Sequence, residues 1–139
     1  FRAFLNKIRR IHMIQSLNTK VDLAIKATSY LGLTTYGNIM IGDKAFEFYN
    51  QRNVADYIQI PWEEVDYVIA SVMFKGKWIP RFAIQTKESG TYSFSSRNNK
   101  QLLRAVSKYV EADHMRKSLT FFQVMGRGVK GLYKKIFKR

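Results

Sequence analysis

Short runs of β-branched and aromatic residues, separated by turn residues and without a long helical period, fill the sequence between Val21 and Ser95. Runs of this kind are typical of β-strands. Seven strands are predicted, at residues 21–28, 37–41, 45–49, 57–60, 65–74, 78–86 and 91–95. The connections contain Gly42, Gly76 and Gly90, and glycine reaches the positive φ values that tight hairpins need. The sequence therefore predicts a mostly antiparallel sheet.

A helix is predicted directly after the last strand. Apolar residues there follow the spacing i, i+1, i+4, i+8 of one helix face, at Leu102, Leu103, Val106 and Val110. Asn98 or Asn99 is placed to cap this helix, which is predicted over 98–112. Seven antiparallel strands closed by one helix is the order found in pleckstrin-homology-like domains. We therefore expect a mainly β (α+β) fold: a seven-stranded antiparallel pleckstrin-homology-like barrel or sandwich with a capping helix.

The net charge of +14 is concentrated at the two ends of the 139-residue chain. Residues 1–12 carry four bases and no acid, and residues 114–139 carry eight bases and no acid. The middle, residues 13–113, holds the remaining twelve bases and all ten acids. We therefore predict one nearly neutral globular domain over 13–113, followed by a basic segment over 114–139.

The first twelve residues are interpreted as a leader that is foreign or translated from upstream. The chain starts with Phe1, and His12 precedes a methionine in the manner of a cloning junction. A native amphipathic helix stays open as an alternative, since Phe1, Leu5, Ile8 and Ile11 fall at helical spacing. No function is assigned to this segment.

The segment from Ser118 to Arg139 is predicted to form a basic amphipathic helix. At about 100° per residue its apolar positions fall on one narrow stripe; they are Phe122, Met125, Val129, Leu132 and Ile136. The opposite arc carries Arg127, Lys130, Lys134, Lys135 and Lys138. Three glycines each cost roughly 1 kcal/mol in a helix interior, so docking would order this segment. These ten residues are the predicted site for a partner or a membrane.

The sequence offers no constellation for catalysis, and we expect no enzyme activity, no cofactor and no metal. There is no cysteine, which removes the commonest zinc ligand. The two histidines are His12, in the leader, and His114, which is interpreted as a solvated surface residue. Glu63 and Glu64 are adjacent, so on an extended backbone their side chains would point to opposite faces.

Two tryptophans are assigned to core packing as the default, Trp62 and Trp78. Trp78 has a second interpretation, because it follows a predicted basic hairpin tip. Lys75, Lys77 and Trp78 are therefore predicted as a secondary contact site.

Five strings place the chain beside a known family: IQSLNTKVD (14–22), GNIMIGDKAFEFY (37–49), YIQIPWEEV (57–65), FKGKWIPRF (74–82) and GTYSFSS (90–96). With these strings the stretch from Met13 to about Lys130 resembles the ManO-type family of unknown function (domain of unknown function 956). Members are encoded beside mannose-class sugar phosphotransferase systems. The resemblance implies a regulatory or accessory role toward the transporter and supplies no catalytic residue.

We expect a non-catalytic accessory protein that docks to the cytoplasmic membrane face, or to the transporter's membrane subunits, through its basic segment. Its expected location is cytoplasmic and peripheral to the inner face of the membrane, since no apolar run approaches the roughly 20 residues of a membrane span. A nucleic-acid-binding regulator of the mannose operon is the alternative, because a basic stripe suits nucleic acid as well. A third hypothesis is that the apolar stripe packs on its own domain.

Overall fold

The computed structural model describes residues 15–53 and 55–119. The strands are β1 (Val21–Ser29), β2 (Thr35–Gly42), β3 (Ala45–Asn50), β4 (Tyr57–Pro61), β5 (Val65–Met73), β6 (Trp78–Thr86), β7 (Thr91–Ser96) and β8 (Met115–Leu119). The helical elements are η1 (Trp62–Glu64), α2 (Asn99–Val106) and η2 (Ala112–His114).

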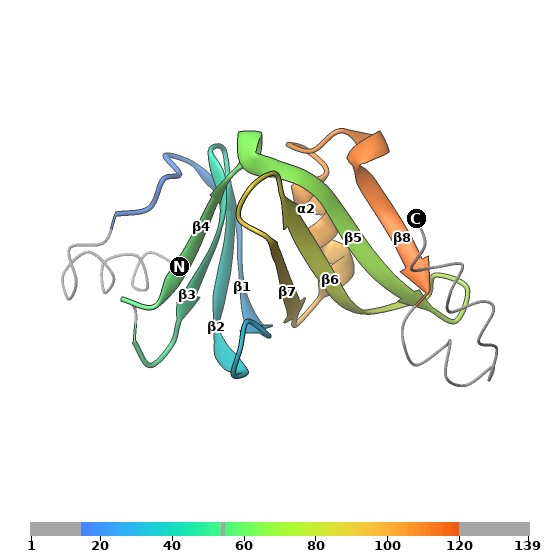
Figure 1. Cartoon of the computed structure of the whole chain (residues 1–139), viewed down its shortest axis with the longest axis horizontal. Helices are drawn as coiled ribbons and strands as arrows, with labels where there is room; N and C mark the ends of the chain where they lie inside the picture. Colours follow the sequence, from blue (N-terminus) through green and yellow to red (C-terminus); the bar gives the residue numbers. More distant parts are fainter. Residues whose placement is uncertain (1–14, 54, 120–139) are drawn as a thin grey trace.

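All eight strands belong to one sheet with the order β4-β3-β2-β1-β7-β6-β5-β8. The sheet bends between β1 and β7, where pairing is limited to Ala27–Ser29 against Phe94–Ser96. Figure 1 shows the resulting two halves, β4 to β1 and β7 to β8, inclined toward each other. Helix α2 packs against strands of both halves, including β1 and β6, and so closes the space between them.

The positions of the seven predicted strands are confirmed to within two residues at each end. The expectation of a seven-stranded antiparallel barrel or sandwich is wrong in one respect, because β8 adds an eighth strand that pairs with β5 in parallel. Its register places Val68 beside Met115 and Val72 beside Leu119. The fold is mainly β with one α-helix, and its sheet extends past residue 113.

Helix α2 is shorter than the predicted span of 98–112. Asn98 caps it as expected, with its side chain accepting a hydrogen bond from Gln101 N at 3.1 Å. The helix ends at Val106, and the chain then turns tightly, since Lys108 N donates to Ala105 O and Tyr109 N donates to Val106 O. The buried face is as predicted and consists of Leu102, Leu103 and Val106, with Val110 also buried beyond the helix.

An aromatic cluster occupies the centre of the core. The Phe94 ring lies 5.0 Å from Phe46, 5.8 Å from Phe48 and 5.8 Å from Phe82, measured between centroids. These distances are those of favourable aromatic pairs. Because the four rings come from β3, β6 and β7, the cluster holds the two halves of the sheet together.

The outer face of β3 holds a buried carboxylate, which fixes the segment before β1. Glu47 is fully buried and accepts hydrogen bonds from Ser16 Oγ at 2.5 Å, Leu17 N at 2.8 Å and Asn18 Nδ2 at 3.0 Å. The Asn18 Oδ1 atom in turn accepts from the backbone N–H groups of Lys44 and Ala45. Residues 16–18 are thereby held against the β2–β3 turn.

A second carboxylate, Asp43, holds the same segment at the surface. It accepts hydrogen bonds from Thr19 Oγ1 at 2.5 Å and from the backbone N–H groups of Thr19 and Lys20. The hydroxyl of Thr19, followed by these N–H groups, lowers the pKa of Asp43 to about 2.

The stability of the fold is therefore expected to fall between pH 4 and pH 2. The pKa of Asp43 is lower in the folded chain than the ordinary 3.8, so its contribution is present above pH 4 and is lost as pH falls through about 2. Thermal melts across this range should show a smaller loss of Tm for Asp43→Asn than for the unmodified chain. An equal loss in both would contradict the assignment.

Candidate docking site

The turn between β5 and β6 forms a sharply bent tip. Three consecutive residues have positive φ, with values of 54° at Phe74, 57° at Lys75 and 85° at Gly76. The turn is closed by Gly76 N donating to Met73 O and Lys77 N donating to Phe74 O, both at 3.1 Å. Positive φ is unusual for a bulky residue such as phenylalanine, so the tip carries local backbone strain.

The tip exposes two aromatic side chains on either side of two lysines. Phe74 is 62% exposed and Trp78 is 51% exposed, and their rings stack at 6.0 Å with an interplanar angle of 17°. Lys75 and Lys77 are both exposed. The assignment of Trp78 to the core is therefore wrong, and the alternative interpretation of this segment as an exposed basic tip with an aromatic neighbour describes its geometry.

Strand direction brings the tip close to the point where the chain enters its basic segment. Since β8 is parallel to β5, its last residue, Leu119, pairs with Val72, one residue before the end of β5. Figure 1 shows the arrowhead of β8 beside the β5–β6 turn. The predicted primary site lies outside the described residues; it comprises Phe122, Met125, Arg127, Val129, Lys130, Leu132, Lys134, Lys135, Ile136 and Lys138. The residues that precede it nevertheless end beside the secondary site.

Charge is segregated along the half of the sheet formed by β7, β6, β5 and β8. The exposed bases toward the tip end include Lys75, Lys77, Arg81, Arg97, Lys100 and Lys117, whereas the guanidinium of Arg116 lies 4.7 Å from the centre of the Tyr67 ring, toward the other end. The acids of this half lie at the other end, in η1, the start of β5, the β6–β7 turn and the segment before β8; they are Glu63, Glu64, Asp66, Glu88, Glu111 and Asp113. The tip end is therefore basic although residues 13–113 as a whole are nearly neutral.

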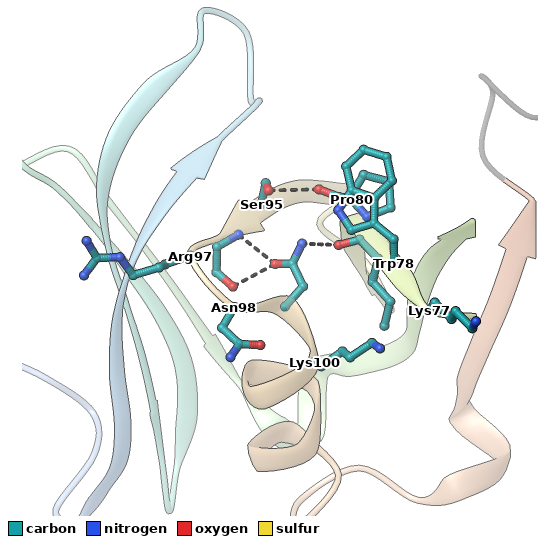
Figure 2. A pocket seen from close by; sticks show the side chains of 10 residues that line it. Lys77, Trp78, Pro80, Ser95, Arg97, Asn98 and Lys100 are labelled. Carbon is teal, nitrogen blue, oxygen red and sulfur yellow. Dashed lines mark hydrogen bonds between the residues drawn. The ribbon is translucent and has the colours of Figure 1, made fainter. Parts of the chain in front are cut away.

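A shallow pocket of about 290 Å³ joins the tip to the start of α2. Its wall is fixed by Asn99, whose Oδ1 accepts from Ser96 N and Oγ and whose Nδ2 donates to Ile79 O at 2.6 Å. Figure 2 shows Lys77 and Lys100 pointing to one side while Arg97 points to the other. The bases here do not converge on one point, so the arrangement suits an extended anionic surface better than a single small anion.

An apolar groove continues from the aromatic pair. This groove of about 590 Å³ on the outer side of the β5–β6 hairpin is lined by Phe74 and Trp78 at one end and by Ile69 and Ala83 further along the strands. Among the described residues that line it, the charged one is Arg81, whose guanidinium lies 4.1 Å from the centre of the Tyr30 ring. The groove adds apolar surface beside a basic rim.

His114 lies at the opposite end of the sheet. We expected a solvated surface residue, but the side chain is half-buried and is held by two contacts. Its ring stacks on Tyr67 at 4.9 Å, and its Nδ1 lies 2.6 Å from the carbonyl oxygen of Asp66. Glu111 and Asp113 are exposed, and their carboxylates lie within 4.8 Å of a ring nitrogen of His114. Exposed acids of this kind are common without an ion, and we assign no metal to them.

At this end the structure corrects the expectation for Glu63 and Glu64 and agrees with the core packing expected for Trp62. Glu63 and Glu64 lie in the 3-10 helix η1 and not on an extended backbone, and both are exposed. Trp62 packs against the core as expected, but it is only partly buried. Its Nε1 donates to Gly42 O at 2.8 Å, and its ring stacks on Tyr109 at 5.2 Å.

The Tyr109 hydroxyl donates a hydrogen bond to Asp22, which ties the segment after α2 to β1. This bond raises the pKa of Tyr109 to about 12 and lowers the pKa of the Asp22 carboxyl. Lys108 Nζ, 3.5 Å from the same carboxylate, lowers it further. These contacts fix the segment after α2 against β1.

Sequence reasoning missed part of the basic end. Phe74 was assigned to a strand, although its place directly before Lys-Gly-Lys signalled a turn. Arg116 and Lys117 were assigned to the basic segment and are in fact exposed residues of β8. Arg97 and Lys100 lie near the tip because α2 starts there. The position of this helix start depends on how distant strands pair, which the local sequence does not reveal.

The chain belongs to the family described as "Domain of unknown function (DUF956)", whose model matches residues 13–129. The expected membership of a family of unknown function is thus confirmed. No curated protein matches the chain. A similar solved structure is the C-terminal domain of an unknown protein from Leishmania infantum, with 14% identity and a TM-score of 0.58, covering 78% of this chain and 94% of that one. At this identity the likeness concerns the fold alone.

Within the described ranges, no helix is long and apolar enough to cross a membrane.

Proposed function

We propose that this protein is a non-catalytic accessory module of a mannose-class sugar phosphotransferase transporter, held at the cytoplasmic face of the membrane by its basic end. The observation that carries the proposal is the position of Leu119 beside the β5–β6 tip. The described chain therefore ends beside the secondary contact site, and the predicted primary site follows it in the sequence. Clustered Lys and Arg are worth about 1 kcal/mol each near an anionic leaflet.

The fold type supports the same role. Seven of the strands run antiparallel in the order β4-β3-β2-β1-β7-β6-β5 and are followed by one helix. We infer that this is a pleckstrin-homology-like barrel to which β8 has been added. Folds of that kind mostly bind lipids or peptides. The association with the sugar transporter rests on the ManO-type resemblance. The basic end of the molecule supports it, because this end would be attracted to the anionic membrane in which the transporter lies.

The proposal is tested by neutralising equal charge at the two ends of the molecule. Lys130→Gln, Lys134→Gln and Lys138→Gln together are expected to weaken binding to anionic vesicles by about two orders of magnitude, from about 1 kcal/mol per base. Binding should also weaken as salt rises, because exposed charges are screened within about 8 Å at physiological ionic strength. Sedimentation with vesicles and with native transporter membranes measures both effects.

The matched control neutralises three exposed lysines near η1. Lys44 O accepts from Trp62 N, Lys20 O accepts from Asp43 N, and Lys87 N donates to Glu64 O, which places all three at the other end. Lys20→Gln, Lys44→Gln and Lys87→Gln remove the same charge and should leave binding nearly unchanged. Equal loss in both sets would mean that net charge alone acts. Loss of DNA binding in a gel shift, with membrane binding intact, would favour the nucleic-acid regulator.

A further inference from the structure

We propose that the β5–β6 tip inserts its aromatic pair into the interface of an anionic bilayer, so that Phe74 and Trp78 enter the headgroup region while Lys75 and Lys77 contact lipid phosphates. This inference rests on the proposed function and names the element that penetrates. The ligand is a lipid surface with anionic headgroups.

The aromatic pair is suited to an interface between water and lipid. Tryptophan is amphipathic and is enriched at membrane–water boundaries, where its ring sits at the level of the headgroups. Phe74 and Trp78 stack on each other and leave more than half of each side chain exposed. They stand at a turn, which projects from the sheet and can enter a bilayer without unfolding.

The backbone holds the pair in this exposed position. Positive φ at Phe74, Lys75 and Gly76 and two backbone hydrogen bonds fix the turn. A strained conformation of this kind persists only where the surroundings impose it, and such strain gathers at ligand-binding sites. Insertion therefore requires little additional ordering of the tip.

The positive charge around the tip attracts an anionic leaflet and repels a basic partner. Lys75, Lys77 and Arg81 are exposed, and Lys117 lies on β8, two strands away from β6. No acidic residue occurs between Tyr67 and Lys87 or from His114 to Leu119. Each base near an anionic surface strengthens binding about fivefold. Because like charges repel, the bases around the tip also disfavour the chain's own basic segment as the occupant of the adjoining apolar groove.

The β1–β2 turn provides an internal comparison. Leu31 and Leu33 are 55% and 87% exposed there, so this turn is also apolar. It has no basic residue between Ser29 and Tyr36. Arg81 reaches the start of this turn, because its guanidinium lies 4.1 Å from the centre of the Tyr30 ring, but the turn carries no lysine of its own. Its electrostatic attraction to an anionic surface is therefore weaker than that of the β5–β6 tip, and we expect it to stay outside the bilayer.

The test uses the full chain and vesicles of phosphatidylcholine with and without 30% phosphatidylglycerol. Trp78 fluorescence, obtained by subtracting the spectrum of Trp78→Phe, should shift to the blue and be quenched by brominated acyl chains only with the anionic vesicles. Phe74→Asn with Trp78→Ser should weaken binding at least tenfold. Asparagine is chosen because it tolerates positive φ. Leu33→Ser should change binding less than twofold, and unchanged Tm values would show that the variants are folded.

The outcomes separate this proposal from the broader one. Anionic vesicle binding without a Trp78 shift, or with unchanged affinity in the double variant, overturns insertion and leaves membrane docking standing. Binding to transporter membranes but not to protein-free vesicles overturns the lipid surface as ligand and favours a protein subunit. A larger loss with Leu33→Ser than with the double variant would assign insertion to the other turn.

Discussion

Replacing Phe94 with alanine is expected to destabilise the fold by about 3–5 kcal/mol, the usual cost of removing a buried aromatic ring. Phe94 is fully buried and contacts Phe46, Phe48 and Phe82, so its loss leaves a cavity where the two halves of the sheet meet. Domains of this kind are stable by only about 5–15 kcal/mol, and the variant would be marginal.

Urea denaturation followed by circular dichroism measures this effect. Leu33→Ala is the matched control, because Leu33 is 87% exposed and its truncation should change stability by about 0.5 kcal/mol or less. A cost below about 1 kcal/mol for Phe94→Ala would contradict the proposed centre of the core.

Glu47→Ala is expected to cost about 3 kcal/mol, since hydrogen bonds to charged groups contribute about 1.5–3 kcal/mol and buried donors left without a partner cost a further 1–3 kcal/mol. Three donors from Ser16, Leu17 and Asn18 converge on this carboxylate. Losing it should release residues 16–18 from the sheet and expose the bond after Lys20 to trypsin.

Glu88→Ala removes an exposed carboxylate in the β6–β7 turn and serves as the control. It should alter neither the urea midpoint nor the rate of cleavage after Lys20. If the two variants lose equal stability, or if cleavage after Lys20 is not accelerated in Glu47→Ala, the network does not anchor the N-terminal segment.

The seven strands could be predicted from the sequence because each has a local signature. Phe82 and Ile84 share one face of β6 while Arg81, Ala83 and Gln85 share the other, and glycine lies in the turns on either side of β6. The helix cap and buried face were equally local. The last turn predicted for α2 was wrong because apolar spacing continues to Val110 while the backbone leaves the helix after Val106.

β8 could not be recognised because its signature is not local. Met115–Leu119 contains the two bases Arg116 and Lys117, which do not suggest a strand. Its position in the sheet depends on pairing with β5, where Met115 pairs with Val68, some 47 residues earlier in the sequence. The buried role of Glu47 has the same origin. Its neighbours Phe46 and Phe48 predict only that it faces away from the core, and the segment that covers it comes from before β1.

The parallel strand β8 also affects the self-association of the protein. With β8 in place, the backbone groups of β5 from Val68 to Val72 are paired within the chain. A chain ending at residue 113 would present them as an open strand edge, which recruits strands from other molecules. In the full chain the edge is the short strand β8, which carries Arg116 and Lys117, and charged residues disfavour such pairing. The fragment should therefore dimerise or aggregate through β5 more readily than the full chain, although every residue of its aromatic core is present.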